Sequence, residues 1–366
     1  MIVDARVEAW AALQAIALPP RALVGLLRHY GGPAAILAAT PADRRRVAPT
    51  AVAAALDAGP PPERLAASLA WLAQPDSDLV AWDDPDYPAA LLEIADPPPV
   101  LYCRGRRELL GRPAFAIVGS RNATPQGIAD AEAFAFALSA AGLVVVSGLA
   151  AGIDAAAHRG ALQAPGSTIA VTGTGPDRVY PAAHRDLAHA IAGHGLLLTE
   201  FTPGTAPLKQ NFPRRNRIVS GLARGILVVE ATLSSGSLIT ARLAAEQGRE
   251  VFALPGSIHS PFSKGCHRLL REGAKLVETA NDILDELRLP AVAPPAPAGP
   301  APARTTPELE PEAKALLDAL GHDPADTDAL AARTGQSAAA TAARLSRLEL
   351  DGIVFALPGG RWQRRP

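Results

Sequence analysis

The sequence contains few of the residues on which several classes of protein depend. Its 366 residues include only two cysteines, Cys103 and Cys266, which are too few for a disulfide framework or a structural zinc site. His184, His189 and His194 are five residues apart, so they would point in different directions on a helix, and we predict no metal. Lysine and arginine number 35 against 36 aspartates and glutamates. A uniformly basic surface is therefore excluded, and a nucleic-acid site would need a local cluster of positive charge.

Motifs for cofactors and catalysis are also absent. No G-x-x-x-x-G-K-[ST] sequence occurs and no G-x-G-x-x-G opens a helix after a strand, so we predict neither ATP nor NAD as a cofactor. Cys266 and His267 are adjacent and would point apart, which disfavours a thiolate–imidazolium pair. His158 fits a helix-packing or loop-bracing role better than that of a base. Three carboxylates could act in acid–base chemistry, or hold a loop or an arginine: Asp154, Glu200 and Glu230. We find no persuasive nucleophile and predict no catalytic residue.

One stretch is long and apolar enough to resemble a membrane span. Residues 133–153 carry no charge, a length that could cross a bilayer. Its first half is typical of a helix, Gly142 ends that helix, and residues 143–146 form an apolar run rich in valine. We interpret the stretch as a buried helix followed by a buried parallel strand, and we expect a cytoplasmic protein without a membrane segment.

Composition divides the chain into four predicted parts. Residues 1–73 contain short helical stretches and small turns, which indicate a helical module similar to helix-hairpin-helix or SAM-type domains; a packing role is favoured over DNA binding. Residues 74–289 alternate apolar runs with helical stretches. Residues 290–307 contain seven prolines and predict an extended linker. Residues 308–366 outline a winged-helix domain. Its third helix carries acids as well as arginines, which is weak charge for binding in a DNA groove, so a role in contacting another protein is at least as well supported.

Seven short apolar runs between residues 74 and 289 predict the strands of a parallel sheet. They are continuous rather than alternating, as expected of strands that helices cover on both faces. The runs are Phe115–Val118, Val144–Val146, Thr168–Val171, Leu196–Thr199, Ile226–Val229, Val251–Ala253 and Leu276–Val277. This alternation predicts an α/β fold with an extended, Rossmann-like, doubly wound parallel sheet.

Segments rich in glycine, serine and threonine follow six of these runs. In a doubly wound sheet the loops after the strands lie at one edge, where free N–H groups can bind ligands. Ordinary turns also favour these residues, but six such loops at one edge indicate a phosphate-binding site. The candidate binding residues in these loops include Gly119, Ser120, Ser147, Gly148, Ser235 and Gly236.

Positive charge is concentrated in one stretch. Residues 201–229 contain no acid but five basic residues, namely Lys209, Arg214, Arg215, Arg217 and Arg224. If a helix begins at Arg214, then Arg214, Arg217 and Arg224 share one of its faces. Arg215 would fall on the apolar side, so it either precedes the regular helix or makes a structural ion pair. Phe212 is either part of the core or a platform on which an unpaired base stacks.

Seven segments resemble, in order, the core blocks of the DNA-processing protein A (DprA, or Smf) family. They run from IVGSRNATPQG at 117–127 to SKGCHRLLREGAKLV at 263–277, and include VVVSGLAAGIDAAAHRGAL at 144–162 and NFPRRNRIVSGL at 211–222. The resemblance covers about residues 114–285 and, more diffusely, 79–112. The helical start and the winged-helix end fit the family's common layout. The family often has asparagine where this chain has Cys266, a difference confined to one loop.

The resemblance implies a DNA site residue by residue. The arginine of the family's G-S-R loop is Arg121, and the lysine and phenylalanine of its K-x-x-F motif are Lys209 and Phe212. The arginines of the F-P-x-R-N-R motif are Arg215 and Arg217. With the loop residues above, Arg214 and Asn216 complete the predicted DNA-binding site.

The resemblance also implies a function. The family comprises single-stranded-DNA-binding recombination mediators that protect incoming DNA and load the RecA recombinase during natural transformation, as homodimers through the Rossmann-like domain and without known catalysis. The alternative is a nucleotide-binding or nucleotide-cleaving enzyme of the phosphoribohydrolase type, recognised by P-G-G-x-G-T-x-x-E. At the corresponding place this chain has SSGSLITA, which lacks the glutamate. A third interpretation, a purely structural scaffold, leaves the basic stretch unexplained.

Overall fold

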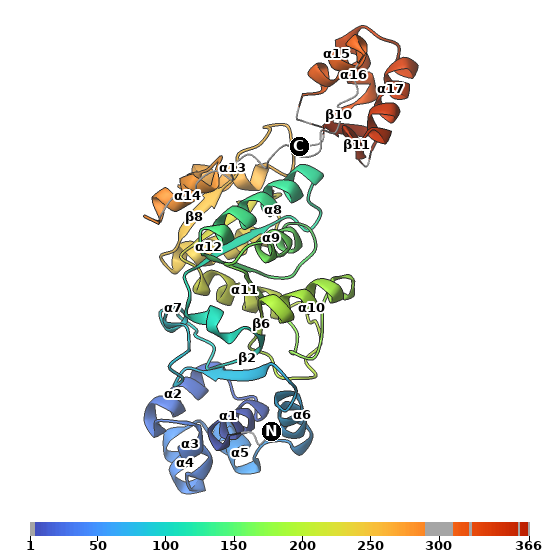
Figure 1. Ribbon diagram of the computed structural model, residues 1–366. Coiled ribbons are helices and arrows are strands. Elements are labelled where there is room, and N and C mark those ends of the chain that lie inside the picture. Colours follow the sequence, from blue (N-terminus) through green and yellow to red (C-terminus); the bar gives the residue numbers. More distant parts are fainter. Residues whose placement is uncertain (1–3, 290–309, 322–323, 358, 365–366) are drawn as a thin grey trace. The chain divides into compact units, whose positions relative to one another are not determined.

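The computed structural model describes residues 4–289, 310–321, 324–357 and 359–364 (Figure 1). Contacts divide the chain into two compact units, one formed by Met1–Ala123 with Asp130–Val292 and the other by Thr124–Ala129 with Ala293–Pro366. The linker predicted at 290–307 lies outside the described residues. Each unit is described by itself below.

Helices form the first part of the larger unit. Their bounds are α1 Ala5–Ala15, α2 Pro20–Tyr30, α3 Pro33–Ala38, α4 Pro41–Val47, α5 Thr50–Ala58 and α6 Pro62–Leu72. Four of them begin with proline in the first turn, where the missing N–H costs nothing and the fixed φ suits a helix. Their apolar sides close around Trp10 and Leu26 and pack on Leu79 and Tyr102 of the sheet. The helices therefore act as a cap on one edge of the sheet.

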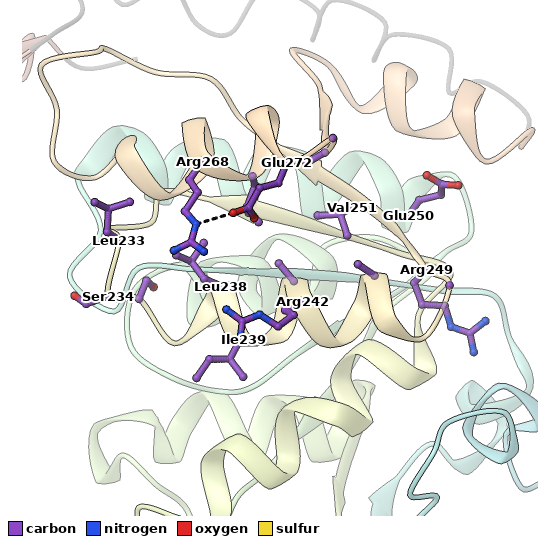
Figure 2. Close-up of a pocket in the computed structure, with 17 residues that line it drawn as sticks. Leu233, Ser234, Leu238, Ile239, Arg242, Arg249, Glu250, Val251, Arg268 and Glu272 are labelled. Atoms are coloured by element: carbon purple, nitrogen blue, oxygen red, sulfur yellow. Dashed lines mark hydrogen bonds and ion pairs between the residues drawn. The ribbon is translucent and has the colours of Figure 1, made fainter.

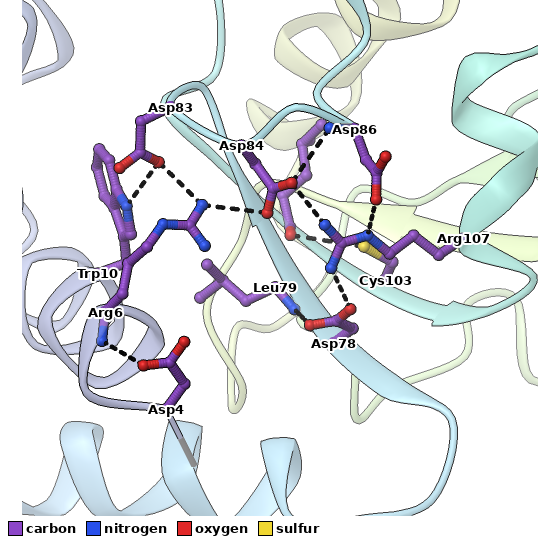
Figure 3. Close-up of polar contacts among 11 residues, drawn as sticks. Asp4, Arg6, Trp10, Asp78, Leu79, Asp83, Asp84, Asp86, Cys103 and Arg107 are labelled. Carbon is purple, nitrogen blue, oxygen red and sulfur yellow. Dashed lines mark hydrogen bonds and ion pairs between the residues drawn. The ribbon is translucent and has the colours of Figure 1, made fainter.

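Ionic contacts tie the first helix to the turn that follows strand β1, Ser77–Ala81 (Figure 3). Arg6 Nη2 lies 3.1 Å from a carboxylate oxygen of Asp83 and of Asp84, and Trp10 Nε1 donates to Asp83 at 3.0 Å. Arg107 Nη2 donates to Asp84 at 2.7 Å. Burial alone would raise the pKa of Asp84, but a backbone N–H and the guanidinium groups of Arg6 and Arg107 lower it below its usual value. Helix α1 and the sheet edge are thus joined by charge as well as by apolar packing.

Nine strands form one sheet in the order β1-β2-β6-β5-β4-β3-β7-β8-β9. Their bounds are β1 Ser77–Ala81, β2 Val100–Gly105, β3 Ala114–Gly119, β4 Val144–Ser147, β5 Thr168–Val171, β6 Leu196–Thr199, β7 Gly225–Val229, β8 Glu250–Ala253 and β9 Lys275–Leu276. Strands β3 to β9 are parallel to one another, while β2 is antiparallel to both β1 and β6. The predicted doubly wound parallel sheet is confirmed, and β1 and β2 add an antiparallel edge that was not predicted.

Helices cover both faces of this sheet. Their bounds are α7 Ala89–Leu92, α8 Pro125–Ala140, α9 Ile153–Leu162, α10 Arg185–His194, α11 Asn211–Leu222, α12 Ser237–Glu246, α13 Lys264–Arg271 and α14 Ala280–Glu286, with short 3-10 turns η1 Arg107–Gly111 and η2 Ala182–His184. One core packs α11, α12 and α13 against alternate residues of the central strands, and α9 and α10 pack on the opposite face. Residues 133–153 form the end of α8 and strand β4, as predicted. In the ranges given above, no helix is both long and apolar enough to cross a bilayer.

The strand order reverses between β3 and β7. From β3 the chain adds β4, β5 and β6 on one side, and it then crosses over to add β7, β8 and β9 on the other. In such sheets ligands bind outside the carboxyl ends of the strands at this reversal. Gly119 ends β3 at this point, and a Cβ atom there would lie 1.8 Å from the Val229 carbonyl oxygen. Only glycine lets the ends of β3 and β7 approach so closely.

The C-terminal part of the smaller unit has its own core. Its elements are α15 Pro311–Leu320, β10 Ala325–Asp326, α16 Thr327–Thr334, α17 Ala338–Leu350, β11 Val354–Leu357 and β12 Arg361–Arg364. Leu316, Leu330, Leu345 and Val354 pack together, and the strands pair in the order β10-β12-β11. Three helices followed by a hairpin confirm the predicted winged-helix domain.

Candidate functional site

A cavity of about 740 Å³ lies at the carboxyl ends of the parallel strands. Its wall takes residues from each of the six loops that were predicted to share this edge. They fall within 119–122, 148–154, 207–219 and 232–240, together with Tyr180 and Phe262. The prediction that these loops converge is therefore confirmed.

The cavity brings together most of the residues predicted to bind DNA. Those on its wall are Gly119, Ser120, Arg121, Gly148, Lys209, Phe212, Arg215, Asn216, Ser235 and Gly236. Ser147, Arg214 and Arg217 are not on the wall. The Ser147 hydroxyl is buried at the end of β4 and donates to the Ile117 carbonyl oxygen at 2.6 Å, so it braces two neighbouring strands.

Two exposed cations stand at the cavity. Arg121 lies on the turn after β3, and Lys209 lies just before α11. Within the described ranges, neither side chain forms a salt bridge, although the charge of Arg121 opposes the rise that burial causes in the pKa of the nearby Asp154 carboxyl. An arginine and a lysine free of internal ion pairs can each form charge-assisted hydrogen bonds to a phosphate.

Phe212 is half-buried in the wall of the cavity. One edge of its ring rests on the backbone of Gly173, where a Cβ atom would lie 3.0 Å from ring atom Cδ1. The Tyr180 ring is 5.6 Å away between centroids, at an angle of 44°. The Arg121 guanidinium carbon lies 5.7 Å from the Phe212 centroid, within cation–π range. The ring is therefore placed where an aromatic platform would have to be, and its stacking on a base stays a prediction.

The basic stretch is partly neutralised by acids from other segments. Arg217 Nη2 and Arg214 Nη2 lie 2.6 Å and 2.8 Å from the same oxygen of Glu200, and Arg217 Nε lies 3.2 Å from Asp96. Glu200 is buried, and burial raises its pKa against the opposing influence of the two guanidinium groups. Arg214 and Arg217 are thus held by an internal carboxylate, and of the roles that the sequence left open for Glu200 this is that of holding an arginine.

The positions of Arg215 and Arg224 relative to helix α11 also differ from those expected. Helix α11 begins at Asn211, so Arg215 does not precede it; its side chain is buried, and Nη1 donates to the Val171 carbonyl oxygen. Burial lowers the pKa of Arg215, and the nearby Asp154 carboxylate opposes that change. Arg224 does not share a helical face with Arg214 and Arg217, because α11 ends at Leu222. That prediction was wrong, since the helix is shorter than assumed.

His158 braces the loop after β4, as its sequence context indicated. The Thr168 hydroxyl donates to the Val145 carbonyl oxygen at 2.6 Å, so it accepts a hydrogen bond from His158 Nδ1 at 2.7 Å. His158 Nε2 then accepts the N–H of Leu149, a residue with positive φ, at 3.3 Å. Burial lowers the pKa of His158 to about 3. The imidazole is therefore neutral at physiological pH and is used in holding the loop.

Cys266 and His267 point to different places. The Cys266 thiol is buried with its sulfur 3.6 Å from the Val228 carbonyl oxygen, and burial raises its pKa to about 12. His267 Nε2 instead lies 2.9 Å from the Gly256 carbonyl oxygen. The two side chains form no catalytic pair, as predicted.

A second cavity, of about 650 Å³, lies beside α12 and α13 (Figure 2). Its wall includes the apolar side chains Leu238 and Val251 and an ion pair in which Arg268 Nε lies 2.8 Å from Glu272. Ser235 belongs to both cavities, but the other predicted binding residues do not line this one. The predicted site therefore corresponds to the first cavity.

Sequence reasoning missed several residues on the wall of the first cavity. Tyr180, Pro207 and Phe262 all line it. The signal for Tyr180 was present, because it is the aromatic residue of the glycine-rich segment that follows β5. Pro207 and Phe262 carry no such signal, since prolines and single aromatics are common in loops.

The fold and the cavity define a class of protein. It has a Rossmann-like doubly wound sheet, a cationic cavity with an aromatic wall at the strand reversal, and a winged-helix domain. The chain belongs to the DNA recombination-mediator protein A family, whose model matches residues 78–288. A second model, the DprA winged helix domain, matches residues 300–360.

Relatives with known names support this assignment. Protein Smf of Escherichia coli K12 is 42% identical over 306 residues, covering 82% of this chain and 81% of that protein. DNA processing protein DprA of Streptococcus pneumoniae R6 is 51% identical over 203 residues, covering 56% of this chain and 72% of that protein.

Two solved structures are also similar. The X-ray structure of DprA from Streptococcus pneumoniae aligns with a TM-score of 0.69 at 38% identity, covering 78% of this chain and 99% of that one. DNA processing protein A from Helicobacter pylori, described with its single-stranded DNA binding mode, aligns with a TM-score of 0.53 at 32% identity. That alignment covers 58% of this chain and 95% of the other.

Proposed function

We propose that this protein binds single-stranded DNA and acts as a recombination mediator that protects incoming strands and loads RecA during natural transformation. The observation that carries the proposal is the convergence of Arg121, Lys209 and Phe212 on one cavity. Free cations can hold phosphates while an aromatic face stacks on a base, which is the combination that single-strand binding uses. A duplex would not offer an unpaired base to Phe212. The single-stranded DNA binding mode described for the Helicobacter pylori relative supports the same proposal.

The remaining predicted residues have distinct proposed roles in this site. Gly236 leaves open space beside the backbone for the DNA strand, because a Cβ atom there would meet nothing within 4 Å. Gly119 and Gly148 act indirectly, since their missing side chains make room for Val229 and for the Arg215 guanidinium, while Ser120, Ser235 and Asn216 offer hydrogen bonds. Arg215 and Ser147 shape the floor from buried positions. Arg214 and Arg217 add positive potential while Glu200 holds them in place.

Charge contacts are tested by the salt dependence of binding. Arg121→Ala and Lys209→Ala are each expected to flatten the plot of log affinity against log salt by about 0.7, the value for one phosphate contact on a single strand. Fluorescence anisotropy with a labelled oligonucleotide at several salt concentrations measures the slope. Arg224→Ala is the matched control, because Arg224 is exposed but absent from the cavity wall. Unchanged slopes for both cavity variants, or an equal change in the control, would contradict the assignment.

We further propose that the protein acts as a homodimer through the Rossmann-like domain. We also propose four parts of the chain: a helical module at 1–73, the DNA-binding domain at 74–289, a linker at 290–307 and a winged-helix domain at 308–366. Membership of the family supports both statements. Sedimentation of the full chain over a range of concentrations tests the dimer. RecA nucleation on a strand already coated with this protein tests the loading step.

We also propose that the protein catalyses no reaction. The cavity wall beside α12 presents the hydroxyl groups of Ser234, Ser235 and Thr240, where the phosphoribohydrolase alternative would need a glutamate. Incubation with ATP, nucleoside monophosphates, or single- and double-stranded DNA, with and without Mg²⁺, is expected to give no product by chromatography. A hydrolysis rate that Asp154→Asn or Glu230→Gln abolishes would favour the enzyme instead.

A further inference from the structure

We propose that Tyr180 is a second base-stacking residue, so that the cavity holds two neighbouring bases of a strand, one on Phe212 and one on Tyr180. The inference rests on the proposed function of the cavity and specifies how many bases it takes. Tyr180 lies in the loop after β5, lines the cavity, and is 49% exposed.

The tilt between the two rings determines what they can bind. Their centroids are 5.6 Å apart and their planes meet at 44°. Two rings at this angle cannot lie flat on opposite sides of one planar base. Each ring can instead offer a face to a different base, and the short distance between the rings suits consecutive bases on one strand.

Hydrogen bonds tie together the segments that carry the two rings. Asn211 Nδ2, at the start of α11, donates to the Gly173 carbonyl oxygen at 3.1 Å, and so ties the helix that carries Phe212 to the loop that carries Tyr180. On the other side of Tyr180, His184 Nδ1 lies 2.9 Å from the Leu149 carbonyl oxygen. A platform anchored at both ends loses little freedom when a ligand binds, which favours affinity.

The Tyr180 hydroxyl differs from those of the two buried tyrosines, Tyr87 and Tyr102. Buried tyrosines in this protein use their hydroxyl groups: Tyr87 donates to the Pro98 carbonyl oxygen at 2.6 Å, and the Tyr102 and Ser68 hydroxyl oxygens are 3.3 Å apart. The Tyr180 hydroxyl has no hydrogen-bond partner in the described part of the chain. A half-exposed ring beside free cations is the arrangement expected of a stacking residue.

The test counts bases on strands of one length. Three oligonucleotides are compared: one fully abasic, one with a single base, and one with two adjacent bases. They present the same phosphates and differ only in the bases available for stacking. For the unaltered protein, we expect the first base and the second base each to raise affinity about tenfold, in the lower part of the range for one base–aromatic stack. Tyr180→Leu keeps an apolar side chain and should lose one of these two steps, whereas Tyr180→Phe should retain both.

The outcomes separate this inference from the proposed function. No binding to any single strand would overturn the proposed function itself. Binding with only one step in the unaltered protein, or with two steps retained in Tyr180→Leu, would overturn the role of Tyr180 alone. Loss of both steps in Tyr180→Leu would show that Tyr180 only supports Phe212, and would also overturn it.

A second measurement needs no variant. Ultraviolet cross-linking of the unaltered protein to a strand with two adjacent 5-iodouracil bases attaches each base to the aromatic ring on which it stacks. Mass spectrometry is expected to find adducts on both Tyr180 and Phe212. Adducts on Phe212 without any on Tyr180 would overturn the inference.

Discussion

Glu200→Ala is expected to lower the free energy of unfolding by about 3–5 kcal/mol, the cost of breaking a buried ion pair by removing one partner. The Glu200 side chain is 3% exposed and that of Arg217 is 11% exposed. Removing the carboxylate leaves the Arg217 guanidinium buried, with the half-exposed Asp96 as its remaining acidic contact. Urea denaturation followed by circular dichroism measures the change.

Arg214→Ala is the matched control for Glu200→Ala. Arg214 bonds to the same oxygen of Glu200, but its side chain is 45% exposed. Exposed ion pairs contribute about 0–1 kcal/mol, so this variant should be nearly as stable as the unaltered protein. Equal losses for the two substitutions would contradict the view that Arg217 is the partner that depends on Glu200.

The parallel sheet could be predicted because its strands have a clear sequence pattern. Strands buried on both faces are continuous apolar runs, and Val144–Val146 and Ile226–Val229 stand out between helical stretches. The antiparallel pair β1 and β2 could not be recognised in the same way. The residues between these two strands, 82–99, are rich in proline and aspartate, a composition typical of loops. The pairing of β2 with β6 joins segments more than ninety residues apart, Val100–Gly105 and Leu196–Thr199, so no local pattern reveals it.

The location of the site could be predicted, but its charge balance could not. Parallel strands place their carboxyl ends at one edge, so a predicted parallel sheet is enough to assign the loop residues Gly119 and Ser235 to a common site. The sequence left open that Glu200 holds an arginine but did not indicate which one, and no pattern placed Asp96 beside Arg217. Local sequence also could not decide whether Phe212 belongs to the core, since its exposure depends on how α11 meets the loop after β5.

Phe212→Ala is expected to weaken binding to single-stranded DNA by about 1–3 kcal/mol, the range measured for one base–aromatic stack. The ring lines the cavity beside Arg121 and Tyr180, but it carries no charge. The salt dependence of binding should therefore stay nearly unchanged, unlike that of Arg121→Ala or Lys209→Ala.

The control for Phe212→Ala is a fully abasic strand of equal length, which carries every phosphate and no base. Its affinity should fall far less than that of the base-bearing strand, as measured by anisotropy under the same conditions. The ring also rests on Gly173, so thermal unfolding of Phe212→Ala and of Phe212→Leu must be measured alongside binding. If Phe212→Ala lowers the melting temperature and weakens both strands alike, Phe212 serves the scaffold, and the cavity recognises a strand by its phosphates alone.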